Sequence, residues 1–103
     1  MTKIQTNALR IIEILYPDID INGIEKYKQF FSSYQGLMPI VFECNRGDSA
    51  IKLKKHFVEF WYLGDNETSH YNDYRSNYII TEPEFIEAFQ LACIKYLELK
   101  CGY

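Results

Sequence analysis

The spacing of apolar residues near the start of the chain predicts a helix over residues 6–16. Apolar side chains recur there at intervals of three and four positions, which is the repeat of a single helical face. They are Ile4, Ala8, Ile11, Ile12 and Leu15. Pro17 is expected to end this helix, because the residue before a proline disfavours helical backbone.

A second helix is predicted over residues 23–35. Its apolar face is largely aromatic, with Ile24, Tyr27, Phe30, Phe31 and Tyr34 at helical spacing. Asn22 followed by Glu25 three positions later is typical of a capping box at the start of a helix. Gly36 is suited to the position that follows the last helical turn.

The period then changes, and the pattern predicts an antiparallel sheet of about three strands. The first strand is expected over residues 38–44, where residues with high strand propensity follow a turn. A long extended stretch is expected over 50–63, followed by a polar loop over 63–73 and a third strand over 74–80. Apolar residues between Phe57 and Tyr62 are too dense for simple alternation, which indicates a bulge or a strand buried on both faces.

A final helix is predicted from the capping sequence at Thr81 and Glu84 to about Leu99, with Leu91 and Ile94 on its outer side. The chain of 103 residues then has room for one domain, residues 1–103. The expected fold class is α+β: two N-terminal helices, an antiparallel sheet of about three strands, and a C-terminal helix packed on one face.

Composition and cysteine use favour a soluble protein of the cytoplasm. No apolar run approaches the roughly 18–20 residues that a membrane-spanning helix needs, and the first residues lack the pattern of a signal peptide. The three cysteines are an odd number without CxxC spacing, which suits free thiols in a reducing compartment. Aromatic residues are unusually abundant at 17%.

Acidic residues are concentrated in one part of the sequence. The whole chain has a net charge of only −3, but residues 59–87 contain seven acids and a single base, Arg75. A protein that binds DNA or RNA directly is expected to carry a basic stripe instead. We therefore expect no direct contact with nucleic acid.

The closest match to a metal-binding motif lies between the first two predicted helices. Asp18, Asp20, Asn22 and Gly23 follow the first half of a calcium loop. The twelfth position of that loop is Gln29, a neutral amide, where a bidentate glutamate normally completes the shell. A capped turn is the preferred interpretation, and no metal or other cofactor is predicted.

No arrangement typical of an enzyme is present. His56 and His70 lack the partner spacing of a zinc site. Cys93 is expected on the apolar face of the last helix and Cys44 beside the acidic Glu43, and neither place suits a reactive thiol. The sequence contains no phosphate-binding glycine loop and no GxSxG motif. We therefore predict that the protein is not an enzyme.

The remaining candidate for function is the acidic, aromatic segment. Tryptophan and tyrosine are enriched at the energetic centres of protein interfaces, and complementary charge selects partners and speeds association. The candidate partner-binding residues are Trp61, Tyr62, Asp65, Glu67, Tyr71, Asp73, Tyr74 and Glu82. They suit a protein partner with a basic cleft; an ordinary acidic surface over a tyrosine-rich sheet is the alternative.

A small size, this acidic aromatic stretch and the lack of a catalytic motif make the chain resemble the small cytoplasmic immunity proteins of bacterial toxin systems, including contact-dependent growth inhibition. The resemblance implies a protein that binds its cognate toxin, often a nuclease with a basic cleft, and covers the active site or a nearby surface. The alternatives are a phage- or plasmid-encoded acidic inhibitor of a host nuclease and, further away, a small enzyme or calcium-binding protein. Whether the chain is monomeric or dimeric is left open.

Overall fold

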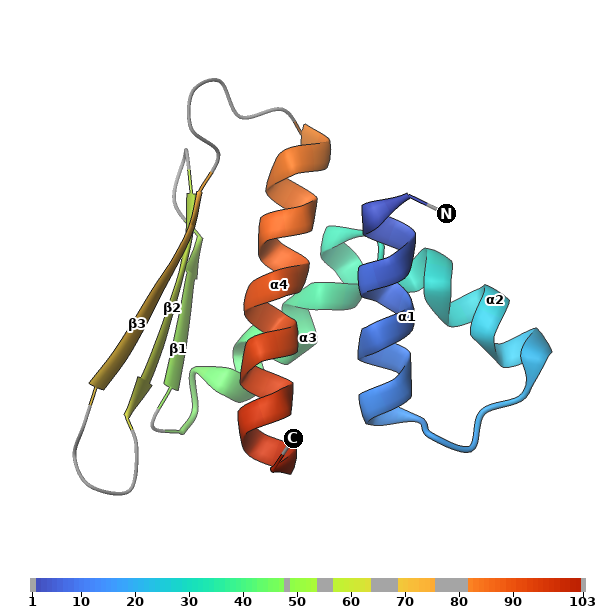
Figure 1. The fold of residues 1–103 in the computed structure, drawn as a ribbon, viewed down its shortest axis with the longest axis horizontal. Helices are drawn as coiled ribbons and strands as arrows, with labels where there is room; N and C mark the ends of the chain where they lie inside the picture. The colour runs from blue at the N-terminus through green and yellow to red at the C-terminus, as the bar shows by residue number, and fades with distance from the viewer. Residues whose placement is uncertain (1, 48, 54–56, 64–68, 76–81, 103) are drawn as a thin grey trace.

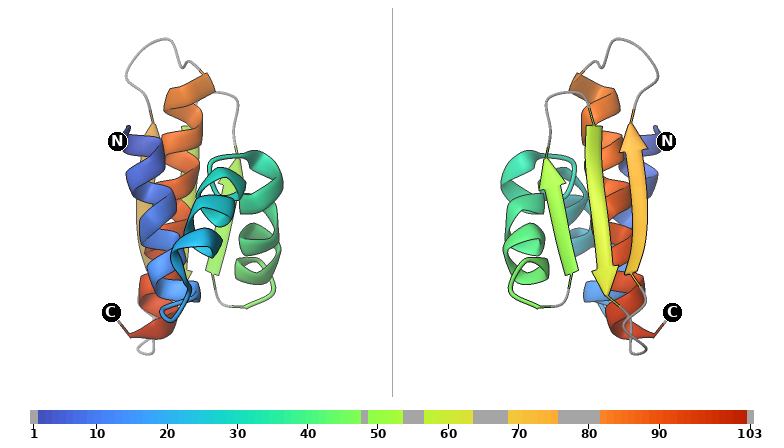
Figure 2. Two further views of the ribbon diagram at one scale, coloured as in Figure 1. Left: turned by 90° about the vertical axis from the view of Figure 1, so that its right-hand side faces the viewer. Right: turned by 90° about the vertical axis from the view of Figure 1, so that its left-hand side faces the viewer.

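The computed structural model describes residues 2–47, 49–53, 57–63, 69–75 and 82–102. Its elements follow one another as three helices, three strands and a last helix (Figure 1). They are α1 Lys3–Leu15, α2 Ile21–Phe30, α3 Tyr34–Cys44, β1 Ser49–Leu53, β2 Phe57–Leu63, β3 Ser69–Arg75 and α4 Glu82–Cys101. The helices all lie on one side of the sheet, with α4 next to it and α2 farthest from it (Figures 1 and 2).

The helix α1 begins earlier than its apolar pattern predicted, because Thr2 caps it. The Thr2 hydroxyl accepts a hydrogen bond from the backbone N–H of Gln5, and the Gln5 side chain accepts one from the backbone N–H of Thr2. This reciprocal pair satisfies two of the N–H groups that a helix start leaves without partners. The face that the pattern predicted to be apolar is buried, including Ala8, Ile11 and Ile12.

The single helix predicted over 23–35 is in fact two helices, because the chain turns sharply after Phe30. Asp20, rather than Asn22, caps α2, and its carboxylate accepts a hydrogen bond of 2.7 Å from the Gly23 N–H. Ser33 caps α3 in the same way. Gly36 lies in the first turn of α3 rather than after the end of a helix, directly against the backbone of Phe30.

The predicted first strand, residues 38–44, is also wrong, because this segment belongs to α3. The residues of α3 that are buried are Gly36, Leu37, Ile40, Val41 and Cys44. Their intervals of one, three and four are the spacing of one helical face, and this periodicity outweighs the strand propensity of isoleucine and valine. The predicted α+β fold class is therefore incorrect: the described chain is mostly helical, with four helices and a third N-terminal helix in place of the first strand.

The three strands are antiparallel neighbours in the order β1-β2-β3. The long stretch predicted over 50–63 is divided into β1 and β2, which pair with each other from Ser49↔Tyr62 to Leu53↔Val58. The strand predicted over 74–80 lies earlier, as β3, and pairs with β2 from Phe57↔Arg75 to Leu63↔Ser69. Residues 76–80 of that predicted strand lie outside the described residues, as does the predicted cap at Thr81.

The helix α4 lies between the sheet and α1, and it is buried on more than one side. Phe89, Ala92, Cys93 and Leu97 have no exposed surface, and Ile94, predicted to point outward, is also buried. Leu91 is 42% exposed, as predicted for the outer side. Ile94 is therefore the exception on a side of α4 that is otherwise largely open, and the core is formed by α1, α3 and α4 together with β1 and β2.

Among the described residues, no helix has the length and apolar character that crossing a membrane requires.

Candidate functional site

One face of the sheet is covered and the other is open. Ile51 and Val58 are buried and belong to the core that the helices form. Alternate residues of a strand lie on opposite faces, so the positions next to these two lie on the face away from α4. None of the described helices lies over that face (Figure 2). We call it the open face; its positions are Ala50, Lys52, Phe57, Glu59, Trp61, Leu63, Ser69, Tyr71, Asp73 and Arg75.

The pairing register arranges the open face in rows across the three strands. Ala50, Trp61 and Tyr71 form one row, so that the two aromatic positions are direct cross-strand neighbours. Lys52, Glu59 and Asp73 form the next row. Directly opposite residues in an antiparallel pair have Cβ atoms roughly 4.5–5.5 Å apart. The open face therefore combines an aromatic row with a row of mixed charge.

The structure brings three of the predicted partner-binding residues together and separates the others from them. Trp61, Tyr71 and Asp73 hold positions on the open face. Tyr62 and Tyr74 hold positions on the covered face, the same face as the buried Val58, and are therefore not part of the open face. Glu82 begins α4. Asp65 and Glu67 lie outside the described residues.

Phe57, Glu59 and Leu63 also hold positions on the open face, although they are not among the predicted partner-binding residues. A signal for them existed in β2, whose apolar residues are too dense for a strand with one solvent-facing side. Finding them requires knowing which face the helices cover, and strand alternation alone does not provide that.

The candidate calcium turn is used as a helix cap. One oxygen of the Asp20 carboxylate accepts the hydrogen bond from the Gly23 N–H, so the turn does carry a helix cap, but at Asp20 and not at the predicted Asn22. In the part of the chain that the structure describes, no group of three or more acidic, histidine or cysteine residues is arranged to hold a metal ion.

Cys93 lacks the environment of a reactive thiol. Cys44 and Cys93 are buried, whereas Cys101 is exposed. Burial raises the pKa of the Cys93 thiol far above its usual range, and the neighbouring Cys44 raises it further. A nucleophilic cysteine needs the opposite shift, because the thiolate is the reactive form. His70 lies in β3 opposite Tyr62, and His56 lies outside the described residues.

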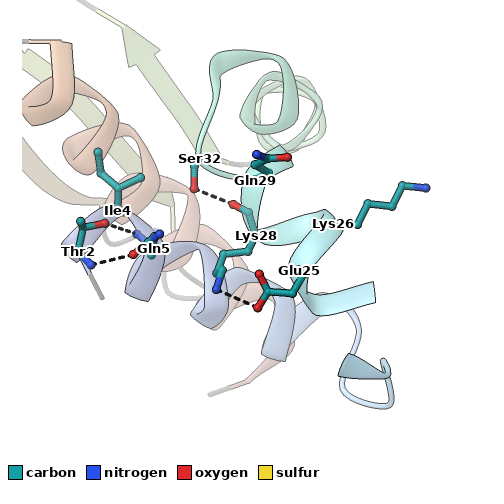
Figure 3. A pocket seen from close by; sticks show the side chains of 8 residues that line it. All are labelled: Thr2, Ile4, Gln5, Glu25, Lys26, Lys28, Gln29 and Ser32. Carbon is teal, nitrogen blue, oxygen red and sulfur yellow. Dashed lines mark hydrogen bonds and ion pairs between the residues drawn. The ribbon is translucent and has the colours of Figure 1, made fainter. Parts of the chain in front are cut away.

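A polar hollow lies between the start of α1 and α2 (Figure 3). Two of its charged groups pair with each other, since the Lys28 ammonium contacts the Glu25 carboxylate at 3.1 Å. The Ser32 hydroxyl donates to the backbone carbonyl of Lys28, and Lys26 points away from the other lining residues (Figure 3). These exposed or half-buried groups give the hollow no set of side chains arranged for acid–base or nucleophilic chemistry.

The chain matches no protein-family model, and no curated protein sequence or solved structure is significantly similar to it. Its function is therefore inferred from its own residues.

Proposed function

We propose that this protein is an inhibitor that binds and neutralises a cognate toxin. In this proposal the open face lies across a basic surface of the toxin, at or near the active site, as a nuclease cleft would offer. The protein would work in the cytoplasm, where a toxin of this kind acts.

The proposal rests on one observation: β2 has apolar residues at positions on both faces of the sheet, whereas the described helices cover one face. The strand has the sequence FVEFWYL, with apolar or aromatic residues at positions on both faces. Among the described elements, only one of these faces is covered. A large apolar surface that the fold leaves open marks an interaction site in soluble proteins, and the row of Trp61 and Tyr71 has the residue types that dominate protein interfaces.

The acidic excess that a basic partner would meet belongs to residues 59–87 as a whole, since the open face itself holds Lys52, Glu59, Asp73 and Arg75. Glu59 and Asp73 are direct cross-strand neighbours, within the most acidic part of the sequence. Lys52 is exposed and lies in the same row, so the open face is not a continuous acidic surface of the kind a nucleic-acid mimic needs. This mixed row favours a toxin inhibitor over the acidic mimic of nucleic acid.

The test is co-expression with the product of the neighbouring gene, because immunity genes normally follow their toxin genes. That product is expected to arrest the growth of a bacterial host, and this chain is expected to restore growth. The double variant Trp61→Lys/Tyr71→Lys should lose protection, because two lysines on the open face repel a basic partner.

The matched control is Phe42→Lys, which places a lysine on α3 at an aromatic residue that is 61% exposed. This variant should protect like the parent, and circular dichroism should show that all the variants are folded. Full protection by the double variant would contradict the assignment to the open face. A neighbouring product that neither arrests growth nor binds the chain would contradict the toxin-inhibitor function.

A further inference from the structure

The C-terminal ends of α3 and α4 are joined by an ion pair. The two helices are in contact, and the Glu43 carboxylate accepts a hydrogen bond from the Lys100 ammonium. Glu43 is the last residue but one of α3, and Lys100 is the last residue but one of α4. Their contact brings the final residues of the two helices near each other. Both of these final residues are cysteines, Cys44 and Cys101.

The two cysteines differ in their exposure to solvent. Positions 93, 97 and 101 are four residues apart and lie along one side of α4. Cys93 and Leu97 have no exposed surface, whereas Cys101, at the end of the row, is exposed. Cys44 is fully buried in the core that α3 and α4 share. The end of α4 therefore offers one accessible thiol beside a buried one.

Tyr96 of α4 also indicates that the two thiols lie close together. Burial first, and then Cys44 and Cys101, raise the pKa of the Tyr96 hydroxyl. Both thiols act on the same phenol, and such effects decline with distance. The Lys100 ammonium lies 6.0 Å from the centre of the Tyr96 ring. The two thiols, the phenol and the ion pair therefore form one cluster at the junction of α3 and α4.

We propose that Cys101 and Cys44 form a reversible disulfide when the protein meets hydrogen peroxide. Peroxide first transfers one oxygen atom to the exposed Cys101 thiol, which becomes a sulfenic acid, and one water is released. The Cys44 sulfur then attacks the sulfenic sulfur: the S–S bond forms, the S–OH bond breaks, and the hydroxide leaves with the Cys44 proton as a second water. The two thiols are oxidised and the peroxide is reduced to water, and a thiol reductant restores both thiols.

The movement that this bond requires is confined to the last turn of α4. A disulfide needs Cα atoms roughly 4.4–6.8 Å apart, and the last turn of a helix is its least firmly held part. Cys101 is the last residue of α4, and Gly102 after it has a φ of 79°, which is typical of a helix end. Unwinding this turn brings Cys101 toward Cys44 and leaves the buried Leu97 in place.

Cys93 is the competing partner for Cys44, and it is poorly suited to the first step. It has no surface that peroxide can reach, and burial raises its pKa far above the usual range. The thiolate is the form that reacts. A bond that forms only under oxidant also agrees with a reducing compartment, where disulfides are usually transient. The inference needs neither the toxin nor the open face.

The bond would strengthen the attachment of the sheet to the helices. It closes a ring over residues 44–101, which contains β1, β2, β3 and α4. Asn45, next to Cys44, holds β1 through two hydrogen bonds of 2.8 and 3.4 Å between its side-chain amide and the backbone of Ile51. A closed ring restricts the unfolded chain. The oxidised protein should therefore unfold at a higher denaturant concentration than the reduced protein.

The test is treatment of the full chain with excess hydrogen peroxide, followed by denaturation, alkylation of the remaining thiols and peptide mass spectrometry without reductant. The expected product is a monomer in which Cys44 is linked to Cys101 and Cys93 is alkylated. Its rate of formation should not change when the protein is diluted about tenfold, because the second step is intramolecular. Dithiothreitol should restore the reduced protein and its lower unfolding midpoint.

Cys101→Ala is the deciding variant, because substitutions at exposed positions rarely disturb the fold. It should form no internal disulfide, and peroxide should no longer raise its unfolding midpoint. Cys93→Ala is the matched control and should form the link like the parent. Circular dichroism before oxidation checks that both variants are folded.

Three outcomes overturn the inference: no internal link, a link between Cys44 and Cys93, or a link between the Cys101 residues of two copies. Each is distinguishable from failure of the proposed function, since rescue in the co-expression test does not depend on these thiols. Formation of the Cys44–Cys101 link in a protein that gives no rescue would leave the disulfide and remove the toxin.

Discussion

Gly36 shows how a single residue sets the approach of two helices. A methyl group at this position would overlap the carbonyl oxygen of Phe30, so only glycine allows α3 to begin where it does. We expect Gly36→Ala to lower the free energy of unfolding by about 2 kcal/mol or more, because the obstruction is backbone and cannot rotate away. Chemical denaturation followed by circular dichroism measures the change.

Gly47 provides the matched control. A methyl group there meets no other atom within 4 Å. Gly47→Ala should therefore change the unfolding free energy by less than about 0.5 kcal/mol, as is usual at exposed sites. Equal effects of the two substitutions would show that helix packing at Phe30 is not the reason for glycine at position 36.

Gln90 is a buried polar residue at the junction of three helices. Its side chain is fully buried in α4, and its amide nitrogen donates hydrogen bonds of 2.9 Å to the backbone carbonyls of Ile4 and Phe31. It therefore joins α4 to the first turn of α1 and to the end of α2. Gln90→Leu should destabilise the protein by about 1–3 kcal/mol, because a buried carbonyl that loses its partner is costly.

Gln90→Glu adds a pH dependence. A buried carboxyl facing two carbonyl oxygens would have a raised pKa, since neither burial nor these neighbours favour its charged form. The stability of this variant should be highest below about pH 4 and fall as pH rises through the raised pKa, because only the unfolded state then ionises freely. Gln29→Leu, at an exposed residue of α2, is the control and should show neither effect.

At the scale of the elements, periodicity was informative where one face of a helix is buried, and misleading where propensity competed with it. The apolar repeat located α1, and the capping pattern lay close to the start of α4. The segment 38–44 was predicted as a strand because it is rich in residues with strand propensity, such as Ile40 and Val41, although its buried residues follow helical spacing. The break after Phe30 depends on the contact with Gly36, which only the folded structure shows.

The candidate site was predictable in its residue types but not in its geometry. The density of aromatic and acidic residues indicated the region of β2 and β3. Which residues share a face depends on the register Trp61↔Tyr71 and on the position of α4, and neither can be read from one sequence. Tyr62 and Tyr74 were therefore grouped with Trp61, although their positions lie on the opposite face.

The molecule as a whole should lose stability at alkaline pH, because its core contains a thiol that resists ionisation. Burial, and then the neighbouring Cys44, raise the pKa of Cys93 in the folded state. The thiol of an unfolded chain ionises above about pH 8.5. Stability is therefore complete below that pH and falls above it, by up to about 1.4 kcal/mol per pH unit for this thiol.

Two variants separate Cys93 from other causes of alkaline unfolding. Cys93→Ala should reduce the loss of unfolding free energy between neutral and alkaline pH. Cys101→Ala should reduce it less, because the exposed Cys101 acts only as the smallest cause of the raised pKa of Tyr96. The pKa of Tyr96 is also raised, by burial first and then by Cys44 and Cys101, so part of the loss of stability should persist in both variants.

In the native protein, a thiol reagent should label Cys101 rapidly and Cys44 and Cys93 only after unfolding. Rapid native labelling of Cys93, or an alkaline loss that Cys93→Ala leaves intact, would show that α4 does not shield this thiol, and with it the sealed core between α4, α1 and the sheet would be contradicted.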